Sequence, residues 1–213
     1  MKDILIITGG SVDYNWASEW LENKKFDYVI AADSGLVHAD ALGTDVDCIL
    51  GDYDSVDKAV LEKYRGRRKI ITYPTEKDYT DTELAINRAV EAAPVRISII
   101  GATGSRYDHA INNIFCMKNA MDKGIECAIY DPHNKIYLKD KSFEIQRKEQ
   151  YGGFLSFAAM SQEAVITLKG VKYPAKDFLL KQGASVCQSN EITDDTALVI
   201  IKKGILIVFE TRD

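Results

Sequence analysis

The sequence predicts two domains of different class: an α/β domain with a parallel, Rossmann-like sheet, followed by an all-β domain that forms an antiparallel sandwich or roll. Two observations carry this prediction. Strand and helix patterns alternate over the first ~130 residues, which is typical of a parallel sheet covered on both faces. After about Asp131 the segments become short and β-rich, with turn signals between them. We therefore place the domains at residues 1–133 and 134–213.

The expected strands of the first domain are short, mostly apolar runs, and Gly or Asp residues follow most of them. These strands cover residues 2–8, 27–32, 47–50, 69–73, 95–100 and 126–130. Helices are expected between them, at residues 16–21, 36–42, 58–64, 81–92 and 109–121. The helix at 81–92 has the clearest periodicity, because apolar or small residues recur on one face.

The second domain shows no comparable helix. Its expected strands cover residues 135–138, 143–146, 154–158, 164–168, 185–188, 197–201 and 205–210. Only residues 176–181 suggest a short helical piece. Several short strands joined by regular turns are typical of an antiparallel sandwich or roll.

Composition narrows the class of protein. The chain has 213 residues, 46% of them hydrophobic, and a net charge of −5, which argues against a nucleic-acid partner. A nucleotide remains compatible, because a metal ion can neutralise both phosphates and carboxylates. No apolar stretch approaches the ~20 residues of a membrane span. The four cysteines form no C-x-x-C pair, and with no secretory signal expected they indicate reduced thiols in the cytoplasm.

The residues that follow the expected strands suggest where a ligand binds. In parallel α/β sheets, ligands bind at the carboxyl ends of the strands. Here almost every such end combines Gly and Asp, which random surface loops would not be expected to do. The segments are residues 8–11, 33–35, 51–55, 78–81 and 101–109.

Asp52 and Asp54 are the first candidates for metal binding. They follow a buried strand, and Gly51 allows a sharp turn there. Two carboxylates at i, i+2 spacing suit Mg²⁺, which takes oxygen ligands and shares them with substrate phosphates. The alternative is a turn whose side chains cap the next helix. Asp81 could complete the metal site, although Asp78, Thr80 and Asp81 also fit the start of a helix, with Thr80 or Asp78 as its N-cap.

The loop at residues 101–109 is a second candidate region. Its Gly residues can expose backbone N–H groups to phosphate, but the spacing is no established phosphate motif, and taken alone the segment is better explained by a tight strand–helix turn. Arg106 favours the phosphate interpretation, because a guanidinium can clamp phosphate oxygens. Asp108 could restrain Arg106 or bind substrate. His109 opens a helix, and we expect it to be partly buried and structural or substrate-shaping rather than catalytic.

Taken in order, these segments resemble the thiamine pyrophosphokinases. That family carries Asp-Gly-Gly, Gly-Asp-Phe-Asp-Ser, Asp-x-Thr-Asp and Gly-x-x-Gly-x-Arg-x-Asp-His segments, which match residues 32–35, 51–55, 78–81 and 101–109 here. A fifth match covers residues 170–174 and 188–191. Ser34 and Ser105 replace usual glycines, a common Pro before Gly51 is absent, and Tyr173 stands where some members have Trp.

The resemblance implies transfer of pyrophosphate from ATP to the hydroxyl of thiamine, giving thiamine diphosphate and AMP. It implies a homodimer in which the α/β domain of one subunit and the β domain of the other share each active site. Mg²⁺ would be held by Asp52, Asp54 and Asp81. The catalytic residues implied are Asp78, Asp81, Arg106 and Asp108, with Asp78 or Asp81 as the proton acceptor.

The resemblance also assigns the binding residues. For the nucleotide they are Gly9, Gly10, Asp33, Gly35, Gly51, Thr80, Gly101, Thr103, Gly104 and Arg106. For thiamine they are Asp81, Asp108, His109, Tyr173, Ser189 and Asn190. Two alternatives keep the fold: a pyrophosphokinase acting on a pterin alcohol, and a non-catalytic sensor of nucleotide or thiamine. The match at Tyr173 and Ser189 favours thiamine, and the intact carboxylate set favours an enzyme.

Overall fold

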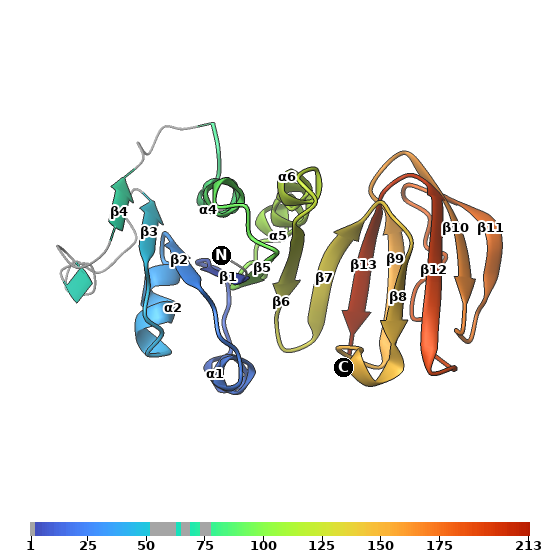
Figure 1. Ribbon diagram of the computed structural model, residues 1–213, viewed down its shortest axis with the longest axis horizontal. Coiled ribbons are helices and arrows are strands. Elements are labelled where there is room, and N and C mark those ends of the chain that lie inside the picture. The colour runs from blue at the N-terminus through green and yellow to red at the C-terminus, as the bar shows by residue number, and fades with distance from the viewer. Residues whose placement is uncertain (1–2, 52–62, 65–68, 73–77) are drawn as a thin grey trace. The chain divides into compact units, whose positions relative to one another are not determined.

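The computed structural model describes residues 3–51, 63–64, 69–72 and 78–213 (Figure 1). The chain divides into two compact units, Met1–Pro132 and His133–Asp213. The metal candidates Asp52 and Asp54 lie outside the described residues, as do residues 58–62 of the expected helix at 58–64 and residue 73 of the fourth expected strand. Residues 63–64, the end of that expected helix, are helical.

The N-terminal unit is built on parallel strands in the order β4-β3-β2-β1-β5-β6. The strands are β1 (Asp3–Ile7), β2 (Tyr28–Ala32), β3 (Cys48–Gly51), β4 (Lys69–Thr72), β5 (Arg96–Ile100) and β6 (Glu126–Tyr130). The chain begins at β1, moves outward to β4, and returns to β5 on the other side of β1. Doubly wound α/β proteins bind ligands at this kind of reversal, where the loops after two adjacent strands diverge.

The central strands are buried on both faces, which explains their continuous apolar runs. In β1 the side chains of Ile4, Leu5, Ile6 and Ile7 are all fully buried. One face packs on a core that includes Leu5, Ile7 and Leu36. The expected strands in this unit are therefore confirmed where the structure describes them.

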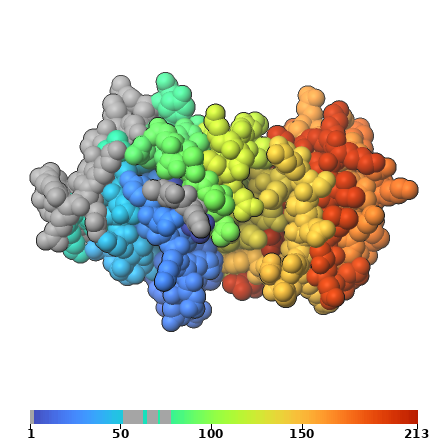
Figure 2. Space-filling model, viewed as in Figure 1, coloured from blue at the N-terminus to red at the C-terminus, as the bar shows by residue number. Residues whose placement is uncertain are grey.

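Helices cover this sheet on both faces (Figure 1). They are α1 (Tyr14–Glu22), α2 (Gly35–Ala41), α4 (Asp81–Glu91), α5 (Tyr107–Cys116) and α6 (Lys118–Met121). In Figure 1, α1 and α2 lie on one face and α4, α5 and α6 on the other; Figure 2 shows the green to yellow-green segment of these three helices at the surface. None of the helices in the described part of the chain is long and apolar enough to span a membrane.

Helix starts follow capping rules. The Asp13 side chain accepts a hydrogen bond from the Trp16 N–H at 3.0 Å and begins α1. Thr80 Oγ1 accepts from the Glu83 N–H at 3.2 Å and begins α4. Capping of this kind satisfies an N–H group that has no partner within the helix. Of the two N-caps that the sequence allowed for α4, Thr80 is therefore the one used.

The C-terminal unit contains two antiparallel sheets, β7-β13-β9 and β11-β10-β12-β8. The strands are β7 (Asn134–Lys139), β8 (Phe143–Gln146), β9 (Phe154–Ala159), β10 (Glu163–Lys169), β11 (Ala175–Lys181), β12 (Thr196–Lys203) and β13 (Leu206–Thr211). A short 3-10 helix, η1 (Arg147–Glu149), follows β8. Burial alternates along β13, where Leu206, Val208 and Glu210 point inward. The fold class is thus the predicted one.

Three sequence-based expectations about elements were wrong. Residues 109–121 form two helices, α5 and α6, which meet at Met117 instead of forming one. Residues 176–181 belong to strand β11, because pairing with β10 outweighs the weak local helical preference. Residues 185–188 form no named strand: Cys187 has a φ of 69°, a left-handed conformation that an extended strand does not accommodate.

Candidate active site

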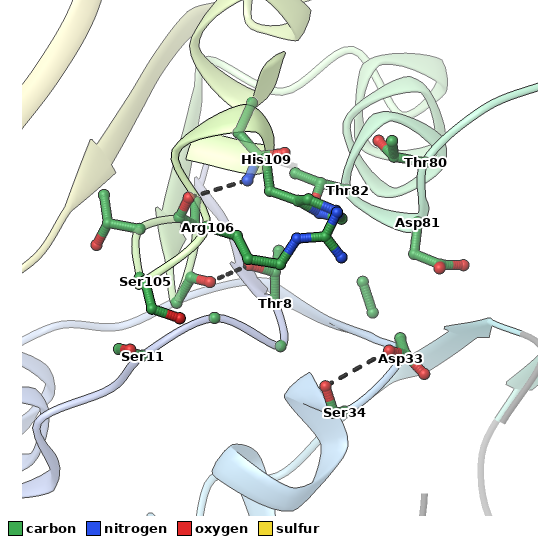
Figure 3. A pocket seen from close by; sticks show the side chains of 18 residues that line it. Thr8, Ser11, Asp33, Ser34, Thr80, Asp81, Thr82, Ser105, Arg106 and His109 are labelled. Atoms are coloured by element: carbon green, nitrogen blue, oxygen red, sulfur yellow. Dashed lines mark hydrogen bonds between the residues drawn. The ribbon is translucent and has the colours of Figure 1, made fainter. Parts of the chain in front are cut away.

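A cavity of about 500 Å³ lies at the reversal between β1 and β5 (Figure 3). It is surrounded by the loops that follow β1, β2 and β5 and by the first turns of α4 and α5. The lining residues are Thr8, Gly9, Gly10, Ser11, Ala32, Asp33, Ser34, Thr80, Asp81, Thr82, Gly101, Ala102, Thr103, Gly104, Ser105, Arg106, His109 and Asn113. The topology therefore brings together residues from four of the five segments that sequence analysis singled out, those at 8–11, 33–35, 78–81 and 101–109.

The loops after β1 and β5 are joined to each other by hydrogen bonds. The Gly10 N–H donates to Gly101 O at 2.7 Å and the Ser11 N–H donates to Thr103 O at 2.8 Å. The Thr8 hydroxyl donates to Gly101 O at 2.6 Å. A Cβ atom on Gly10 would lie 2.3 Å from Gly101 O and 2.4 Å from Thr103 O, so this contact requires glycine. The result is a preformed wall, in which the Gly10 N–H is already occupied.

Asp33 occupies an unusual backbone conformation at the rim of this wall. Its φ is 51°, which Asp tolerates better than most residues with a side chain. Its N–H donates to Leu50 O at 2.7 Å, and its carboxylate accepts from the Ser34 hydroxyl at 3.4 Å. Strained conformations of this kind persist where the surrounding structure imposes them, often at functional sites. Here the turn places the Asp33 carboxylate at the cavity (Figure 3).

Asp81 lies in the first turn of α4, directly after the Thr80 cap. In Figure 3 the labelled carboxylates of Asp33 and Asp81 lie on the same side of the pocket. Two carboxylates at one wall would repel a phosphate group, because both the carboxylates and the phosphate are negatively charged. The carboxylates suit a cation that would in turn attract phosphate oxygens.

Arg106 supplies the positive charge of the site. Its Nη2 donates to Asp108 Oδ2 at 2.7 Å and its Nε donates to Asp108 Oδ1 at 3.3 Å. The hydrogen bond from Arg106 lowers the pKa of Asp108, so the pair stays charged at neutral pH and is lost only in acid. Both side chains are about two-thirds exposed, at 68% and 65%, so the contact is easily exchanged for one to a ligand. Of the two roles the sequence allowed for Asp108, the structure shows the restraint of Arg106.

His109 corrects a sequence-based expectation. Its side chain is 51% exposed, which is more than the partial burial that we expected, and its Nε2 lies 3.9 Å from Asp108 Oδ2. The phase of α5 explains the difference. The helix buries the face of Asn113 and Cys116, whereas Ile111, which suggested burial of His109, is itself 55% exposed. His109 therefore stands at the edge of the cavity with access to solvent.

Several predicted ligand-binding residues do not line the cavity. Gly35 is needed for packing, because a Cβ there would lie 2.1 Å from Ile7 O, where α2 approaches β1. Gly51 has a φ of 150°, and a Cβ there would lie 3.2 Å from the Asp33 Cα. Asp78 and Asp108 are also absent from the lining. For the two glycines, the sequence pattern records a steric requirement of the backbone.

Three carboxylates, those of Asp52, Asp54 and Asp81, are the predicted ligands of Mg²⁺. Asp52 and Asp54, two of the three predicted ligands, lie outside the described residues. Within the described residues no three His, Cys, Asp or Glu side chains are grouped as a metal site. The carboxylates of Asp33 and Asp81 are nevertheless hard oxygen donors of the type that Mg²⁺ takes. The oxygen donors of Asp33 and Asp81 therefore fit the ligand preference of Mg²⁺.

Sequence analysis missed three residues that shape the cavity. Asn113 is buried and its Nδ2 donates to Ala102 O at 2.9 Å. Asp131, 8% exposed, accepts from the Thr103 hydroxyl at 3.0 Å. Asp131 could have been found, because it follows the sixth strand and so continues the pattern of Asp residues at strand ends. Asn113 had no such signal.

His38 is the third missed residue. Its Nε2 lies 2.8 Å from Gly10 O, and its Nδ1 lies 2.8 Å from the Tyr14 hydroxyl. A carbonyl oxygen only accepts, so Nε2 carries the proton of that bond. In neutral His38, Nδ1 therefore accepts from Tyr14. These bonds link α1 and α2 to the cavity wall at Gly10, so His38 holds the Gly10 carbonyl while Gly101 holds the Gly10 N–H.

The predicted thiamine residues of the β domain all lie in the C-terminal unit. The Tyr173 side chain is 60% exposed, whereas Asn190 is only 2% exposed. The Ser189 N–H donates to the Ser156 hydroxyl at 2.8 Å. Tyr173 is thus available to a ligand, and the buried Asn190 side chain is not.

The fold and the cavity together define a doubly wound α/β protein with a switch-point pocket that combines acidic and guanidinium groups, as phosphate-transferring proteins do. Comparison with known families identifies which one. Residues 20–129 match the thiamin pyrophosphokinase catalytic domain, and residues 142–206 match the thiamin pyrophosphokinase vitamin B1 binding domain. The chain belongs to the thiamine pyrophosphokinase family.

Individual relatives agree with this assignment. The chain is 29% identical over 187 residues to the thiamine pyrophosphokinase of Bacillus subtilis, covering 87% of this chain and 84% of that protein. The crystal structure of the Bacillus subtilis enzyme matches with a TM-score of 0.89 at 28% identity, covering 100% of both chains. The crystal structure of the thiamin pyrophosphokinase from Geobacillus thermodenitrificans matches with a TM-score of 0.85 at 25% identity, covering 99% of this chain and 98% of that chain. The structure of thiamin pyrophosphokinase from Candida albicans shows the shared fold. It matches with a TM-score of 0.84 at 18% identity, covering 99% of this chain and 89% of that chain.

Proposed function

We propose that this protein transfers the pyrophosphoryl group of ATP to the hydroxyl of thiamine, giving thiamine diphosphate and AMP. The observation that carries the proposal is the switch-point cavity. Arg106 and the carboxylates of Asp33 and Asp81 line it together with a preformed backbone wall. Family membership selects the substrates. In Figure 3 the Arg106 guanidinium extends from the β5–α5 loop towards the side of the pocket where Asp81 lies.

In this mechanism the thiamine oxygen attacks the β-phosphorus of ATP, the bond from that phosphorus to the bridging α–β oxygen breaks, and AMP leaves. The hydroxyl proton passes to a carboxylate of the site. Arg106 would leave Asp108 and donate hydrogen bonds to the phosphoryl oxygens, where it would stabilise the negative charge that develops during transfer. The wall of Gly10, Gly101 and Thr103 would hold the nucleotide in place without rearranging, because its internal hydrogen bonds are already formed.

Mg²⁺ belongs to the proposal as a cofactor that neutralises phosphate charge when bound. Asp81 would hold it together with Asp52 and Asp54, and Asp33 offers a further oxygen donor at the same wall. Of the two candidates for proton acceptor, Asp81 lines the cavity and Asp78 does not. The position of Asp81 in the lining therefore supports Asp81 as the residue that contacts the reacting groups.

We also propose a homodimer in the cytoplasm, in which the β domain of a second copy completes the thiamine site. The support is an apolar stripe on α5 at helical spacing. Tyr107, Ile111 and Phe115 are 78%, 55% and 42% exposed, and they adjoin Arg106 and His109 of the cavity. Large exposed apolar side chains in a row are typical of an interaction surface. Ile111→Glu should shift the mass measured by light scattering from dimer to monomer, and an unchanged mass would contradict this interface.

The activity is tested by incubating purified protein with ATP, Mg²⁺ and thiamine and separating the products by chromatography. Equal amounts of AMP and thiamine diphosphate are expected. A hydroxymethyl pterin as acceptor is the matched control, since the alternative activity would consume it instead. Asp81→Asn and Asp54→Asn should each reduce kcat by orders of magnitude while the protein stays folded. No AMP formation with thiamine, under conditions where the protein binds ATP, would refute the proposal.

A further inference from the structure

Asn190 makes a set of hydrogen bonds that a ligand-contacting side chain would not need. Its Oδ1 accepts from the Tyr173 N–H at 3.0 Å and from the Glu191 N–H at 3.0 Å. Its Nδ2 donates to the Tyr173 carbonyl at 3.0 Å. Both polar groups of the Asn190 amide are thus engaged, and both contact the main chain of one residue, Tyr173.

The main chain of Asn190 is fixed as firmly as its side chain. Its N–H donates to Leu155 O at 3.0 Å, and the Leu155 N–H donates to Asn190 O at 2.7 Å. The preceding residue is held as well, through the bond from the Ser189 N–H to the Ser156 hydroxyl in β9. Asn190 therefore connects the segment around Tyr173 to the buried strand β9.

The residue that is held in this way presents an exposed aromatic ring. The Tyr173 side chain is 60% exposed, although its main chain is clamped on both the N–H and the carbonyl side. A rigid aromatic side chain offers a large contact area at a low cost in conformational entropy. The Lys172 ammonium lies over the Tyr173 ring, 5.7 Å from its centre, which is within the range of a cation–π interaction.

We propose that Asn190 is a positioning residue that orients Tyr173 as a platform for the cationic thiazolium ring of thiamine. It acts through the Tyr173 main chain and does not touch the ligand. This inference rests on the proposed function and deepens it. A direct contact would require Asn190, at 2% exposure, to break one of its hydrogen bonds and leave a buried polar group unpaired.

A double-mutant cycle distinguishes the two roles, because substitutions that act through the same group are not additive. Tyr173→Ala and Asn190→Asp are made singly and together. Asp keeps the shape of Asn but places an acceptor against the Tyr173 carbonyl. We expect each single substitution to raise the KM for thiamine about five- to thirtyfold, the range of a lost cation–π contact, and to leave the KM for ATP within about twofold.

In the Tyr173→Ala background, Asn190→Asp should change the KM for thiamine by less than about twofold. Multiplying effects would indicate direct contact and overturn the proposal, as would an unchanged KM in Asn190→Asp or an equal rise for ATP. Glu191→Gln is the matched control. It breaks the exposed ion pair with Lys172, which joins the same two segments at 2.6 Å, and should leave both KM values within about twofold.

Hydrogen exchange on the unsubstituted protein tests the clamp without any variant, in case Asn190→Asp fails to fold. The Tyr173 and Glu191 amides should exchange slowly although the Tyr173 ring is exposed, because both donate to the buried Oδ1. Unprotected exchange of the Tyr173 amide would overturn the inference. This measurement is independent of turnover, so a protein with protected amides and no activity on thiamine would refute the proposed function and retain the clamp.

Discussion

The adjacent glycines Gly9 and Gly10 provide the sharpest test of the cavity wall, because the structure predicts different outcomes for the same substitution. In Gly10→Ala the new Cβ would lie 2.3 Å and 2.4 Å from two carbonyl oxygens, Gly101 O and Thr103 O. Both belong to main chain that cannot rotate away. In Gly9→Ala the nearest atom is the Ser34 hydroxyl oxygen at 1.9 Å, which can move by rotating about χ1.

The magnitude follows from what has to break. Relieving the Gly10→Ala overlap means separating the two loops, which costs about 1–3 kcal/mol for the displaced packing. It also weakens the bonds from the Gly10 and Ser11 N–H groups, at about 1 kcal/mol each. We expect a loss of about 3–5 kcal/mol and a fall in the melting temperature of about 10 °C. Gly9→Ala leaves a tight 3.2 Å contact to the Ser34 Cβ and should cost about 1 kcal/mol.

The assay combines thermal unfolding with turnover of ATP and thiamine. Gly10→Ala should lose at least about a hundredfold in kcat/KM, because a displacement near 1 Å at a substrate-positioning element has effects of that size. Gly153→Ala is the control, since a Cβ there meets nothing within 4 Å, and it should behave like the unsubstituted protein. Equal damage from Gly9→Ala and Gly10→Ala, or a normal Gly10→Ala protein, would refute the steric argument.

Three further predictions concern other parts of the chain. Arg106→Lys keeps the charge but loses the planar guanidinium that donates two hydrogen bonds to Asp108, so kcat should fall at least about tenfold with little change in the KM for ATP. Kinetics equal to those of the unsubstituted protein would make Arg106 a plain surface charge. Lys135→Met leaves the fully buried Glu210 carboxylate without the ammonium 2.7 Å away and should cost about 3 kcal/mol in urea unfolding, and adding Glu210→Gln should recover most of it. Burial raises the pKa of Cys116 to about 11, so its alkylation at pH 8 should be about a hundredfold slower than that of a free thiol and should accelerate tenfold per pH unit; fast labelling would contradict this burial.

Much of the fold was predictable because local pattern and tertiary structure agree in the N-terminal unit. Strands such as β1 are apolar along their whole length, since both faces of a central parallel strand are covered. The position of the site was predictable for the same reason. Polar and glycine residues at the carboxyl ends of these strands have to meet at one edge of the sheet, and the structure brings Gly10, Asp33 and Gly101 together there.

The errors arose where a residue's neighbours come from distant segments. The segment at 176–181 has no strong pattern of its own, and its strand conformation depends on pairing with β10. His109 is more exposed than expected, because apolar residues on α5 suggested partial burial, whereas the helix turns Ile111 outward. His38 had no local signal, since its meaning lies in contacts with Gly10 and Tyr14, 28 and 24 residues away in sequence.

The sequence by itself determined the fold class, the family and the chemical groups of the site, because hydrophobic periodicity and short motifs are local properties of the chain. The tertiary structure decided which role each group plays. It separated the glycines that line the cavity from Gly35, whose missing side chain allows a helix to approach a strand. It paired Arg106 with Asp108 and buried Asn190 beneath Tyr173. These roles depend on distances between segments that only the folded chain brings together, so no pattern within a single segment could encode them.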